Sequence, residues 1–449
     1  MEFEDIPTIN DIPVPDEDEQ VKEELQRLGQ PVFINGEDDD GRRERLKNLL
    51  NDNNGQGELI DEDDEDDEDD EDEEFYTPGP EVLYNTRLRI LRDSLSKASD
   101  RLKLQRQIVK ENPEFIKVLK FRRDINSKLS LIELYGSQVI PDITRAISSV
   151  KFSNQSDLIA CGSWDGSIHV LNSTDLNPVT KLSTGHIEKV GSLDWRPDTE
   201  ENILLSGGND GNIRMWGINA NTPTTNPLST LADAHTDRIT STMFHPINDL
   251  AISTSFDQTW KLWDLTKQTE LYQQEGHSKG IFCGSVHPDG SLFLSGGLDG
   301  IIYVWDLRSG RALMPLQKHM QGIYGLDWSP NGHEFASASG DCSVKIWDMR
   351  KLDHSGKELH TIPAHTKLVS NVKFFRKSTK DVQTNNGTFL VTSSYDGIVN
   401  VWSADNWVKV NTLKGHGDKV MSCDIGVMDD HFTIVSSGWD RSVKLWKNN

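Results

Sequence analysis

The sequence predicts a mainly β protein: a seven-bladed β-propeller preceded by a small helical motif and basic helices. Three observations lead to this prediction: a repeat with a period of 42 to 55 residues, short apolar segments separated by turns, and four residue types in fixed register. The chain has 449 residues, which is long enough for one large core with additional segments.

A pattern of four residues defines the repeat. An Asp is followed six residues later by a Trp, a Ser or Thr lies four residues before the Asp, and a His lies further upstream. The pattern occurs six times, at His186, Ser206, Asp210 and Trp216; His235, Ser253, Asp257 and Trp263; His277, Ser295, Asp299 and Trp305; His319, Ser337, Asp341 and Trp347; His365, Thr392, Asp396 and Trp402; and His416, Ser436, Asp440 and Trp446. A seventh, degenerate copy precedes them, with Cys161, Asp165 and Leu171 in three of the positions.

Short strand-like segments fill each repeat. LAISTS (250–255), WKLWDL (260–265) and SVKIWDM (343–349) are apolar or alternate in polarity, and DG, PDG and PNG turns separate such segments. Four short strands per repeat form an antiparallel sheet, and a closed ring of sheets leaves few unpaired edges. Seven copies therefore predict seven blades.

Ser, His and Asp are also the residue types of a serine hydrolase, but an active site occurs once, whereas this set recurs in register. The repeat resembles the WD40 repeat over roughly residues 129–449, and WD dipeptides stand at 263–264, 305–306 and 347–348. In that family the Trp, Ser or Thr, His and Asp form a hydrogen-bond chain inside the blade. The resemblance therefore implies that the six sets brace the blades and are not catalytic.

Closure of the ring is expected to involve a segment that precedes the first repeat. The run LSLIELYGSQ (129–138) is apolar and strand-like but belongs to no repeat, and the last repeat lacks the strand that follows the Trp in the others. We expect 129–138 to pair beside the strand that carries Trp446. The first blade, which lacks the Trp, the Ser and the His, is expected to be the least stable.

One face of the propeller is the expected binding surface. In the WD40 family this face is lined by the residue before each repeat Asp and by residues shortly after each upstream His. These positions include the following aromatic, basic and Met residues: Trp164, Lys189, Arg238, Phe256, Phe282, Tyr324, Tyr395, Lys419, Met421 and Trp439. Such side chains suit a protein interface or an RNA contact, and the alternative is that they pack on neighbouring loops.

Charge divides the N-terminal third from the rest of the chain. Residues 1–81 carry 32 acidic and 6 basic residues, and residues 82–128 carry 13 basic and 5 acidic residues. We expect a disordered tail at 1–15, two short helices at 16–51, an acidic disordered linker at 52–81, a basic helical segment at 82–128 and the propeller at 129–449. The fourteen consecutive carboxylates at 61–74 serve either as a solvated spacer or as a screen for the basic segment.

The segment VKEELQRLGQPVFINGEDDDGRRERLKNLL (21–50) resembles the splicing factor motif. One family joins this motif to a seven-bladed WD40 propeller, namely the pre-mRNA processing factor four family of the spliceosomal U4/U6 small nuclear ribonucleoprotein. The resemblance implies a nuclear scaffold that binds a companion U4/U6 processing factor, U4 and U6 snRNA and other tri-snRNP proteins. In some members a cyclophilin also binds the region before the propeller.

The basic segment is expected to form two helices. Leu88, Leu91, Leu95, Ala98 and Leu102 form an apolar stripe at steps of three and four residues. The candidate cations lie largely off that stripe, at Arg87, Arg89, Arg92, Lys97, Arg101, Lys103 and Arg106, with Arg122 and Arg123 at the expected end of the second helix. The favoured interpretation is contact with a partner helix and RNA phosphates, and the alternative is packing on the protein's own propeller. Asn112 and Pro113 are the expected cap and first residue of the second helix.

Other classes find little support in the sequence. There is no P-loop, no metal-ligand spacing and no nucleophile elbow, so we expect no enzyme activity and no cofactor. The four cysteines are far apart, the N-terminus has no apolar signal segment, and no run of 18 apolar residues predicts a membrane span. A different adaptor, such as a ubiquitin-ligase substrate receptor or a G-protein-like subunit, would explain the propeller but not the 21–50 motif.

Overall fold

The computed structural model describes residues 18–27, 41–47, 81–111, 115–140, 142–182, 185–197, 202–218, 226–352, 356–376, 387–428 and 431–448. The chain divides into two compact units, Met1–Gly79 and Pro80–Asn449. The basic segment and the propeller therefore belong to one unit.

The described residues of the first unit are helical and lie in or next to the 21–50 motif. Helix α1 spans Asp18–Arg27, and residues 41–47 are also helical. Val21, Leu25 and Leu46 are buried in this unit. The expected tail, the acidic run at 61–74 and the Gly29–Pro31 segment lie outside the described residues.

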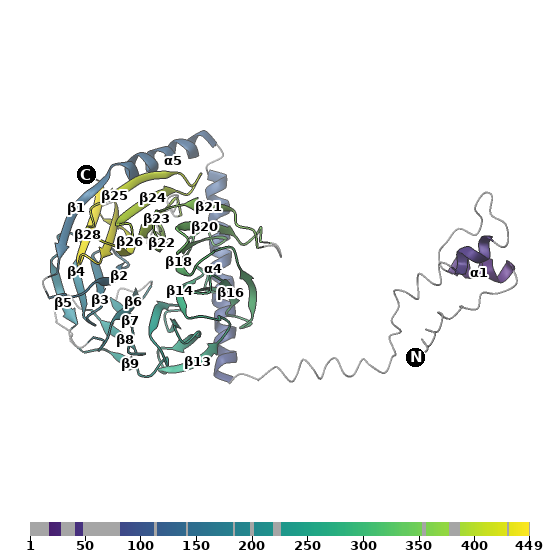
Figure 1. Cartoon of the computed structure of the whole chain (residues 1–449), viewed down its shortest axis with the longest axis horizontal. Helices are drawn as coiled ribbons and strands as arrows, with labels where there is room; N and C mark the ends of the chain where they lie inside the picture. Colours follow the sequence, from purple (N-terminus) through teal and green to yellow (C-terminus); the bar gives the residue numbers. More distant parts are fainter. Residues whose placement is uncertain are drawn as a thin grey trace, which may run out of the picture. The chain divides into compact units, whose positions relative to one another are not determined.

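The second unit is a seven-bladed propeller, as the repeat predicted, and each sheet has four antiparallel strands (Figure 1). Blade 1 contains β2 (Ile147–Phe152), β3 (Leu158–Ser163), β4 (Ile168–Asn172) and β5 (Pro178–Leu182); blade 2 contains β6 (Val190–Trp195), β7 (Ile203–Gly208), β8 (Ile213–Gly217) and β9 (Ser229–Leu231). Blade 3 contains β10 (Ile239–Phe244), β11 (Leu250–Ser255), β12 (Trp260–Asp264) and β13 (Thr269–Gln274); blade 4 contains β14 (Ile281–Val286), β15 (Leu292–Gly297), β16 (Ile302–Asp306) and β17 (Ala312–Leu316). Blade 5 contains β18 (Ile323–Trp328), β19 (Glu334–Ser339), β20 (Ser343–Asp348) and β21 (His360–Pro363); blade 6 contains β22 (Val369–Phe374), β23 (Phe389–Ser394), β24 (Ile398–Ser403) and β25 (Lys409–Lys414). Blade 7 contains β26 (Val420–Met428), β27 (His431–Gly438), β28 (Ser442–Asn448) and β1 (Ile132–Val139).

Strand β1 closes the ring, which confirms the expected pairing. It runs antiparallel to β28, with Leu134 opposite Trp446 and Ile132 opposite Asn448. The expected start of this strand at residue 129 was early, because the preceding helix continues to Ser130. Leu129 lies on this helix and is fully buried in the same core cluster as Trp446. Its apolar side chain therefore packs the end of the helix against the core and is not part of the strand.

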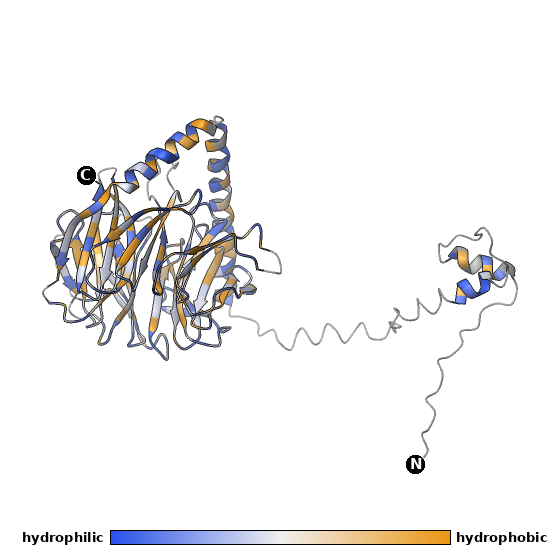
Figure 2. Ribbon diagram, turned by 45° about the horizontal axis from the view of Figure 1, so that its top comes forward, coloured by the Kyte–Doolittle hydropathy of each residue, from blue (hydrophilic) through white to orange (hydrophobic). Residues whose placement is uncertain are grey.

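The core of each blade lies around its second strand, which is buried along almost its whole length (Figure 2). The first strand of each blade lines the central channel, and its pairing with the second strand is interrupted by a bulge near its start in all seven blades. A bulge bends a strand and redirects its side chains. We call the first strand of each blade its inner strand. The bulge leaves the start of each inner strand at one rim of the channel, and the rest of the strand lies inside the channel.

Two helices precede β1 and pack on the propeller. Helix α4 spans Glu81–Glu111 and helix α5 spans Phe115–Ser130, and residues 112–114, including the expected cap, lie outside the described residues. The expectation that the second helix ends at Arg122–Arg123 was wrong. The helix continues because Ile125 and Leu129 extend its apolar face into the core between blades 6 and 7. Among the described residues, no helix is long and apolar enough to cross a membrane.

Candidate functional site

The six repeated sets form one hydrogen-bond chain in each of blades 2 to 7. The Trp Nε1–H donates to the Ser or Thr hydroxyl oxygen at 2.8–3.0 Å. The same hydroxyl lies 2.7–2.8 Å from the His Nε2, and the His Nδ1 lies 2.8–3.0 Å from an Asp carboxylate oxygen. A neutral His with its proton on Nδ1 satisfies every link, because the hydroxyl then donates to Nε2 and the imidazole donates to the carboxylate.

The geometry argues against hydrolysis at these sets. All six hydroxyl residues have no exposed surface, so a substrate has no access to them. A nucleophilic hydroxyl must reach an acyl carbon, whereas each of these oxygens already accepts an indole hydrogen and lies inside a sheet. The sets hold the second and third strands of a blade to the loop that carries the His.

The Asp of each set is held in its charged form. Burial alone would raise the pKa of Asp257, but the hydrogen bonds from His235 and Thr259 lower it well below the usual 3.8. The same balance lowers the pKa of Asp341 and Asp440. The carboxylates are therefore acceptors throughout the neutral range.

Blade 1 has a smaller substitute for this chain. Asp165 accepts hydrogen bonds from the Ser167 hydroxyl at 2.6 Å and the Ser167 N–H at 3.0 Å, and Ser167 contacts the His169 ring. Cys161 and Leu171 are fully buried at the positions of the Ser and the Trp. Asp165 also accepts a hydrogen bond from the Thr144 N–H at 3.3 Å, so this network joins the turn to the loop before β2 but has no Trp–Ser link in the core of the blade.

Half of the expected rim residues form one continuous aromatic and cationic array over blades 6, 7, 1 and 2. Lys419 lies over both the Tyr395 ring, at 5.2 Å, and the Trp439 ring, at 4.4 Å. Trp439 contacts Trp164 edge to face at 5.3 Å, and Lys189 lies 4.2 Å from the Trp164 ring centre. Trp439 is 38% exposed, so the centre of the array is open to a partner.

Four others form a second array over blades 3, 4 and 5. The Arg238 guanidinium lies 3.6 Å from the Phe256 ring centre. Phe256 contacts Phe282 at 6.3 Å, and Phe282 contacts Tyr324 at 4.9 Å, both edge to face. Met421, the tenth rim residue, lines the cavity that opens between the two arrays. The rim residues thus contact one another and also surround the mouth of the channel. Packing among these residues is therefore compatible with their forming a binding surface.

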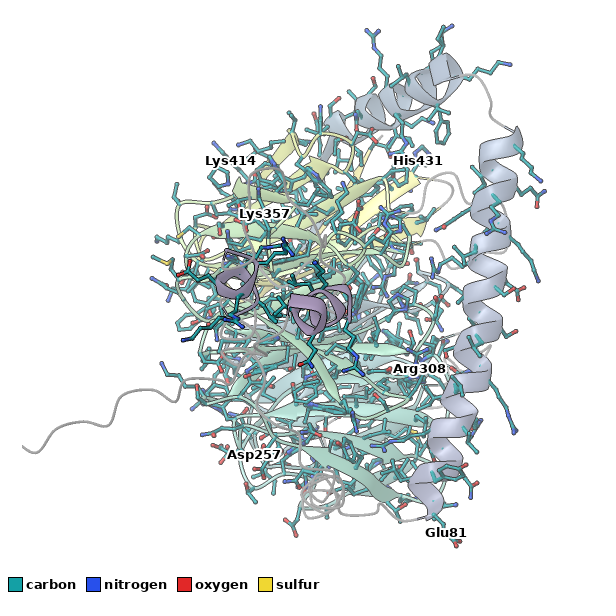
Figure 3. The ribbon with its side chains drawn as sticks, turned by 90° about the vertical axis from the view of Figure 1, so that its right-hand side faces the viewer. Glu81, Asp257, Arg308, Lys357, Lys414 and His431 are labelled. Atoms are coloured by element: carbon teal, nitrogen blue, oxygen red, sulfur yellow. The ribbon has the colours of Figure 1, made fainter. Side chains whose placement is uncertain are left out.

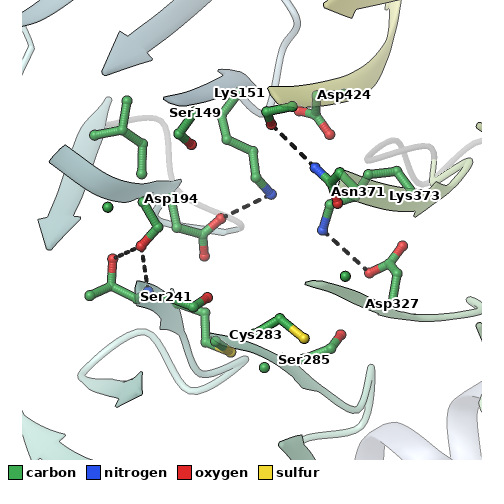
Figure 4. Close-up of a pocket in the computed structure, with 18 of the residues that line it drawn as sticks. Ser149, Lys151, Asp194, Ser241, Cys283, Ser285, Asp327, Asn371, Lys373 and Asp424 are labelled. Carbon is green, nitrogen blue, oxygen red and sulfur yellow. Dashed lines mark hydrogen bonds and ion pairs between the residues drawn. The ribbon is translucent and has the colours of Figure 1, made fainter. Parts of the chain in front are cut away.

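The channel below the rim contains a ring of charges that the sequence did not indicate to us. The cavity has a volume of about 1040 Å³, and the fifth residue of every inner strand lines it. These residues are, from blade 1 to blade 7, Lys151, Asp194, Met243, Ser285, Asp327, Lys373 and Asp424 (Figure 4). Aligning the repeats on their inner strands would have found them. Acid and lysine alternate through blades 5, 6, 7, 1 and 2.

These charges are used to join neighbouring blades. Asp194 accepts a hydrogen bond from the Phe244 N–H at 3.0 Å, and Asp327 and Asp424 accept equivalent bonds from the next blade at 2.8 and 2.9 Å. Burial would lower the pKa of Lys151, but Asp424 and Asp194 raise it above the usual 10.5. Each of these carboxylates already accepts a hydrogen bond from the next blade, so we interpret the charges as links between blades and not as a ligand-binding site. Among the described residues, no group of three His, Cys, Asp or Glu side chains could hold a metal ion.

Helix α4 lies along the propeller (Figure 3) and contacts it through the buried Leu83 and Ile90 and through several of its cations. Arg101 makes three hydrogen bonds to Asp289, at 3.0, 3.1 and 2.6 Å, and one to the Asn331 carbonyl at 2.7 Å. Arg89 bonds Asp249 at 2.7 Å, and Lys97 bonds the Pro246 carbonyl at 2.9 Å. The contacted turns follow the inner strands of blades 3, 4 and 5, at the opposite end of those strands from the rim.

The expectation that these cations all face RNA or a partner requires correction. Arg89, Lys97 and Arg101 contact the propeller, Arg122 pairs with Asp405, and Arg87 lies over the Tyr272 ring at 4.9 Å. The physical reason is that turn carboxylates and carbonyls of the propeller, which cannot be located from the helix sequence, satisfy them. The remaining four are on the surface: Arg92, Lys103, Arg106 and Arg123. Lys103 pairs there with Asp100 at 3.3 Å.

The fold, the repeated braces and the rim define a WD-repeat β-propeller. Comparison with known proteins agrees: the "WD domain, G-beta repeat" family matches residues 225–264, 268–306, 310–348, 356–403 and 407–447, and the "Anaphase-promoting complex subunit 4 WD40 domain" family matches 150–244. The family described as "pre-mRNA processing factor 4 (PRP4) like" matches residues 21–49.

The relatives extend this match over the chain. The U4/U6 small nuclear ribonucleoprotein PRP4 of Saccharomyces cerevisiae is 43% identical over 444 residues, which cover 96% of this chain and 90% of that protein. The chain therefore belongs to the pre-mRNA processing factor 4 family of WD-repeat proteins. The U4/U6 small nuclear ribonucleoprotein Prp4 of Homo sapiens is 34% identical over 200 residues, covering 44% of this chain and 37% of that protein. An uncharacterized WD repeat-containing protein of Schizosaccharomyces pombe is 39% identical over 255 residues, covering 55% and 53%.

Proposed function

We propose that this chain is a non-enzymatic scaffold subunit of the U4/U6 and U4/U6.U5 small nuclear ribonucleoproteins and acts in pre-mRNA splicing in the nucleus. The observation that carries the proposal is the 43% identity to a U4/U6 small nuclear ribonucleoprotein over 96% of the chain, which includes both the 21–49 motif and the propeller. The buried braces support a role in recognition, because their hydroxyls are inaccessible to a substrate.

The scaffold offers two surfaces on opposite ends of the inner strands. The rim, with Trp164, Trp439 and Lys419 at its exposed centre, has the aromatic and cationic composition of a protein interface. On the other side, the exposed Arg123 of α5 remains for phosphate contact, and the exposed Arg92 and Arg106 of α4 remain for a partner protein. The companion processing factor, the U4 and U6 snRNAs, other tri-snRNP proteins and a cyclophilin are the proposed partners of these surfaces and of the 21–50 motif.

Sequencing of RNA crosslinked to the tagged, full-length protein in living cells tests this proposal. U4 and U6 snRNA should be enriched at least tenfold over U1 and U2 snRNA, and crosslinks should map to the helical segment. Recovery of no snRNA above the untagged background would refute it.

A second function remains open because one comparison favours it. The DDB1- and CUL4-associated factor 11 homolog of Caenorhabditis elegans is 32% identical over 123 residues, but these cover 27% of this chain. A ubiquitin-ligase adaptor would co-purify with a cullin ligase in amounts near one to one and without snRNA. Mass spectrometry of the same crosslinked preparation separates the two functions.

A further inference from the structure

The expected apolar stripe of α4 is not the face that packs on the propeller. The docked row of the helix contains Leu83 and Ile90, which are buried, and Ser94, Lys97 and Arg101. These residues lie at steps of seven, four, three and four, which keeps them on one side of the helix, and each precedes a position of the stripe or of its extension at Tyr84 by one residue. In an α-helix one position corresponds to roughly 100° of rotation, so the stripe lies about a quarter turn away from the docked row.

The stripe is exposed along the helix. Tyr84 precedes Leu88 by four residues and extends the expected stripe by one turn. Tyr84 is 65% exposed, Leu95 is 57% exposed and Leu102 is 44% exposed, and Leu88 and Leu91 are half-buried. From Tyr84 to Leu102 the stripe extends for roughly 27 Å at 1.5 Å per residue. A contiguous apolar row of this length on the surface is typical of a protein contact. In Figure 2, hydrophobic and hydrophilic residues alternate along the ribbons of both helices that precede β1.

The charges beside the stripe indicate the chemistry of its occupant. Arg92, Arg106 and Lys110 are exposed. Arg92 follows Leu91 by one residue, Arg106 follows Leu102 by four, and Lys110 follows Arg106 by four, so at roughly 100° per residue all three lie on the edge of the stripe away from the docked row. We propose that this surface of α4, formed by Tyr84, Leu88, Leu91, Leu95 and Leu102 and edged by these cations, binds an amphipathic helix of a partner protein. That helix has apolar residues at steps of three and four and acidic residues at its flanks. The inference extends the proposed function by locating a protein contact of the scaffold.

Three other occupants fit the surface less well. RNA phosphates leave the leucines in contact with water, and five of the nine expected cations are already engaged on the propeller. A second copy of this chain would bring two stripes with the same cationic edge together, because a two-fold interface joins the same patch of both subunits, and that edge would then meet no acidic flank. The acidic run at 61–74 of the same chain has no apolar residue with which to cover Leu95 and Leu102.

Cysteine footprinting on the assembled particle tests the proposal. The full-length chain carries Leu95→Cys in a Cys342→Ser background, because the other three native cysteines are buried. Leu313→Cys, at an exposed leucine on β17 away from the stripe (47% exposed), is the matched control. Both variants should react with a maleimide as free proteins. In the particle purified through a tag, labelling of Leu95→Cys should fall at least tenfold, ribonuclease should not restore it, and labelling of Leu313→Cys should change less than threefold.

A cysteine-reactive photo-crosslinker at the same position identifies the occupant. The crosslinked peptide should come from another protein and should have the apolar spacing and acidic flanks stated above. Leu95→Glu combined with Leu102→Glu should lower recovery of that protein at least tenfold, and Leu313→Glu should not. Unchanged labelling in the particle, restoration of labelling by ribonuclease, a crosslink to a second copy, or a peptide without the stated pattern would each overturn the inference. Absence of U4 and U6 snRNA from the particle would instead contradict the proposed function, and the labelling result would still decide the inference.

Discussion

The brace of blade 4 predicts a large effect from the loss of one oxygen atom. In Ser295→Ala, the indole of Trp305 loses its acceptor at 2.8 Å and His277 loses the donor to its Nε2, also at 2.8 Å. Ser295 is fully buried, so no water replaces the hydroxyl without rearrangement of the sheet. The variant therefore leaves two buried polar groups without partners.

The magnitude follows from those two groups. A buried polar group left without a partner costs about 1–3 kcal/mol. Two such groups in one chain, with partial relaxation of the sheet, give an expected loss of about 2–4 kcal/mol in the free energy of opening blade 4. Because 1.4 kcal/mol corresponds to a factor of ten, the opening equilibrium should rise roughly 30- to 700-fold.

Native-state hydrogen exchange measured by mass spectrometry tests this value on peptides that contain β15 and β16. Ser309→Ala is the control, because Ser309 is an exposed serine in a turn of the same blade and should change exchange by less than threefold. An increase below threefold in Ser295→Ala, or an equal increase in both variants, would refute the view that the hydroxyl joins the brace.

Four further predictions address other parts of the molecule. In the same exchange experiment on the unaltered protein, β3 and β4 of blade 1 should exchange faster than β15 and β16, and equal rates would show that the missing brace is immaterial. Burial lowers the pKa of His245 from 6.5 to about 4, so the contribution of His245 to stability is complete above pH 6.5 and declines as the pH falls from 6.5 to 4. His245→Gln should therefore reduce the dependence of the urea midpoint on pH in that window. An unchanged slope would contradict the lowered pKa of His245. Arg101→Ala leaves the buried carboxylate of Asp289 on blade 4 unpaired and should lower the free energy of unfolding, measured by heat or urea, by about 3–5 kcal/mol. Lys103→Ala breaks an exposed ion pair and should lower it by less than about 1 kcal/mol. Similar losses in the two variants would refute the role of Arg101 in docking α4. Alanine at Trp164 and Trp439 should weaken recovery of partner proteins at least fivefold while the melting temperature falls by less than 3 °C, and a large fall in melting temperature would favour packing as their role.

The repeat made the fold predictable because its residues act locally. Each brace joins residues within one blade, so the spacing of His277, Ser295, Asp299 and Trp305 contains the whole geometry. Ring closure was predictable for a related reason. The strand-like segment 129–138 belongs to no repeat, and the repeat that carries Trp446 lacks its fourth strand, so the segment supplies that strand. The rim positions also followed from the repeat, since they stand at fixed offsets from the same Asp.

The orientation of α4 was not predictable in this way. The apolar stripe suggested where a contact lies, but the docked row is held by Arg101 and Lys97, whose partners are turn groups of blades 3, 4 and 5. Those partners lie more than 140 residues away in sequence. A sequence also does not distinguish a Lys or Arg that docks on the propeller from one that faces a partner. The charge ring was missed for a different reason: the inner-strand position of Lys151 and Asp194 carries Lys, Asp, Met or Ser in different blades and is not one of the four residues that define the repeat.

Strand β1 has a consequence for the synthesis of this chain. It is made before any of the blades, yet its partner β28 follows about 300 residues later. At ribosomal rates of about 5–20 residues per second, β1 waits roughly 15–60 s with its hydrogen-bonding edge unoccupied. During that interval the nascent chain presents a free strand directly behind two amphipathic helices, which makes this the stage at which it is most open to pairing with a wrong neighbour and has most need of a chaperone.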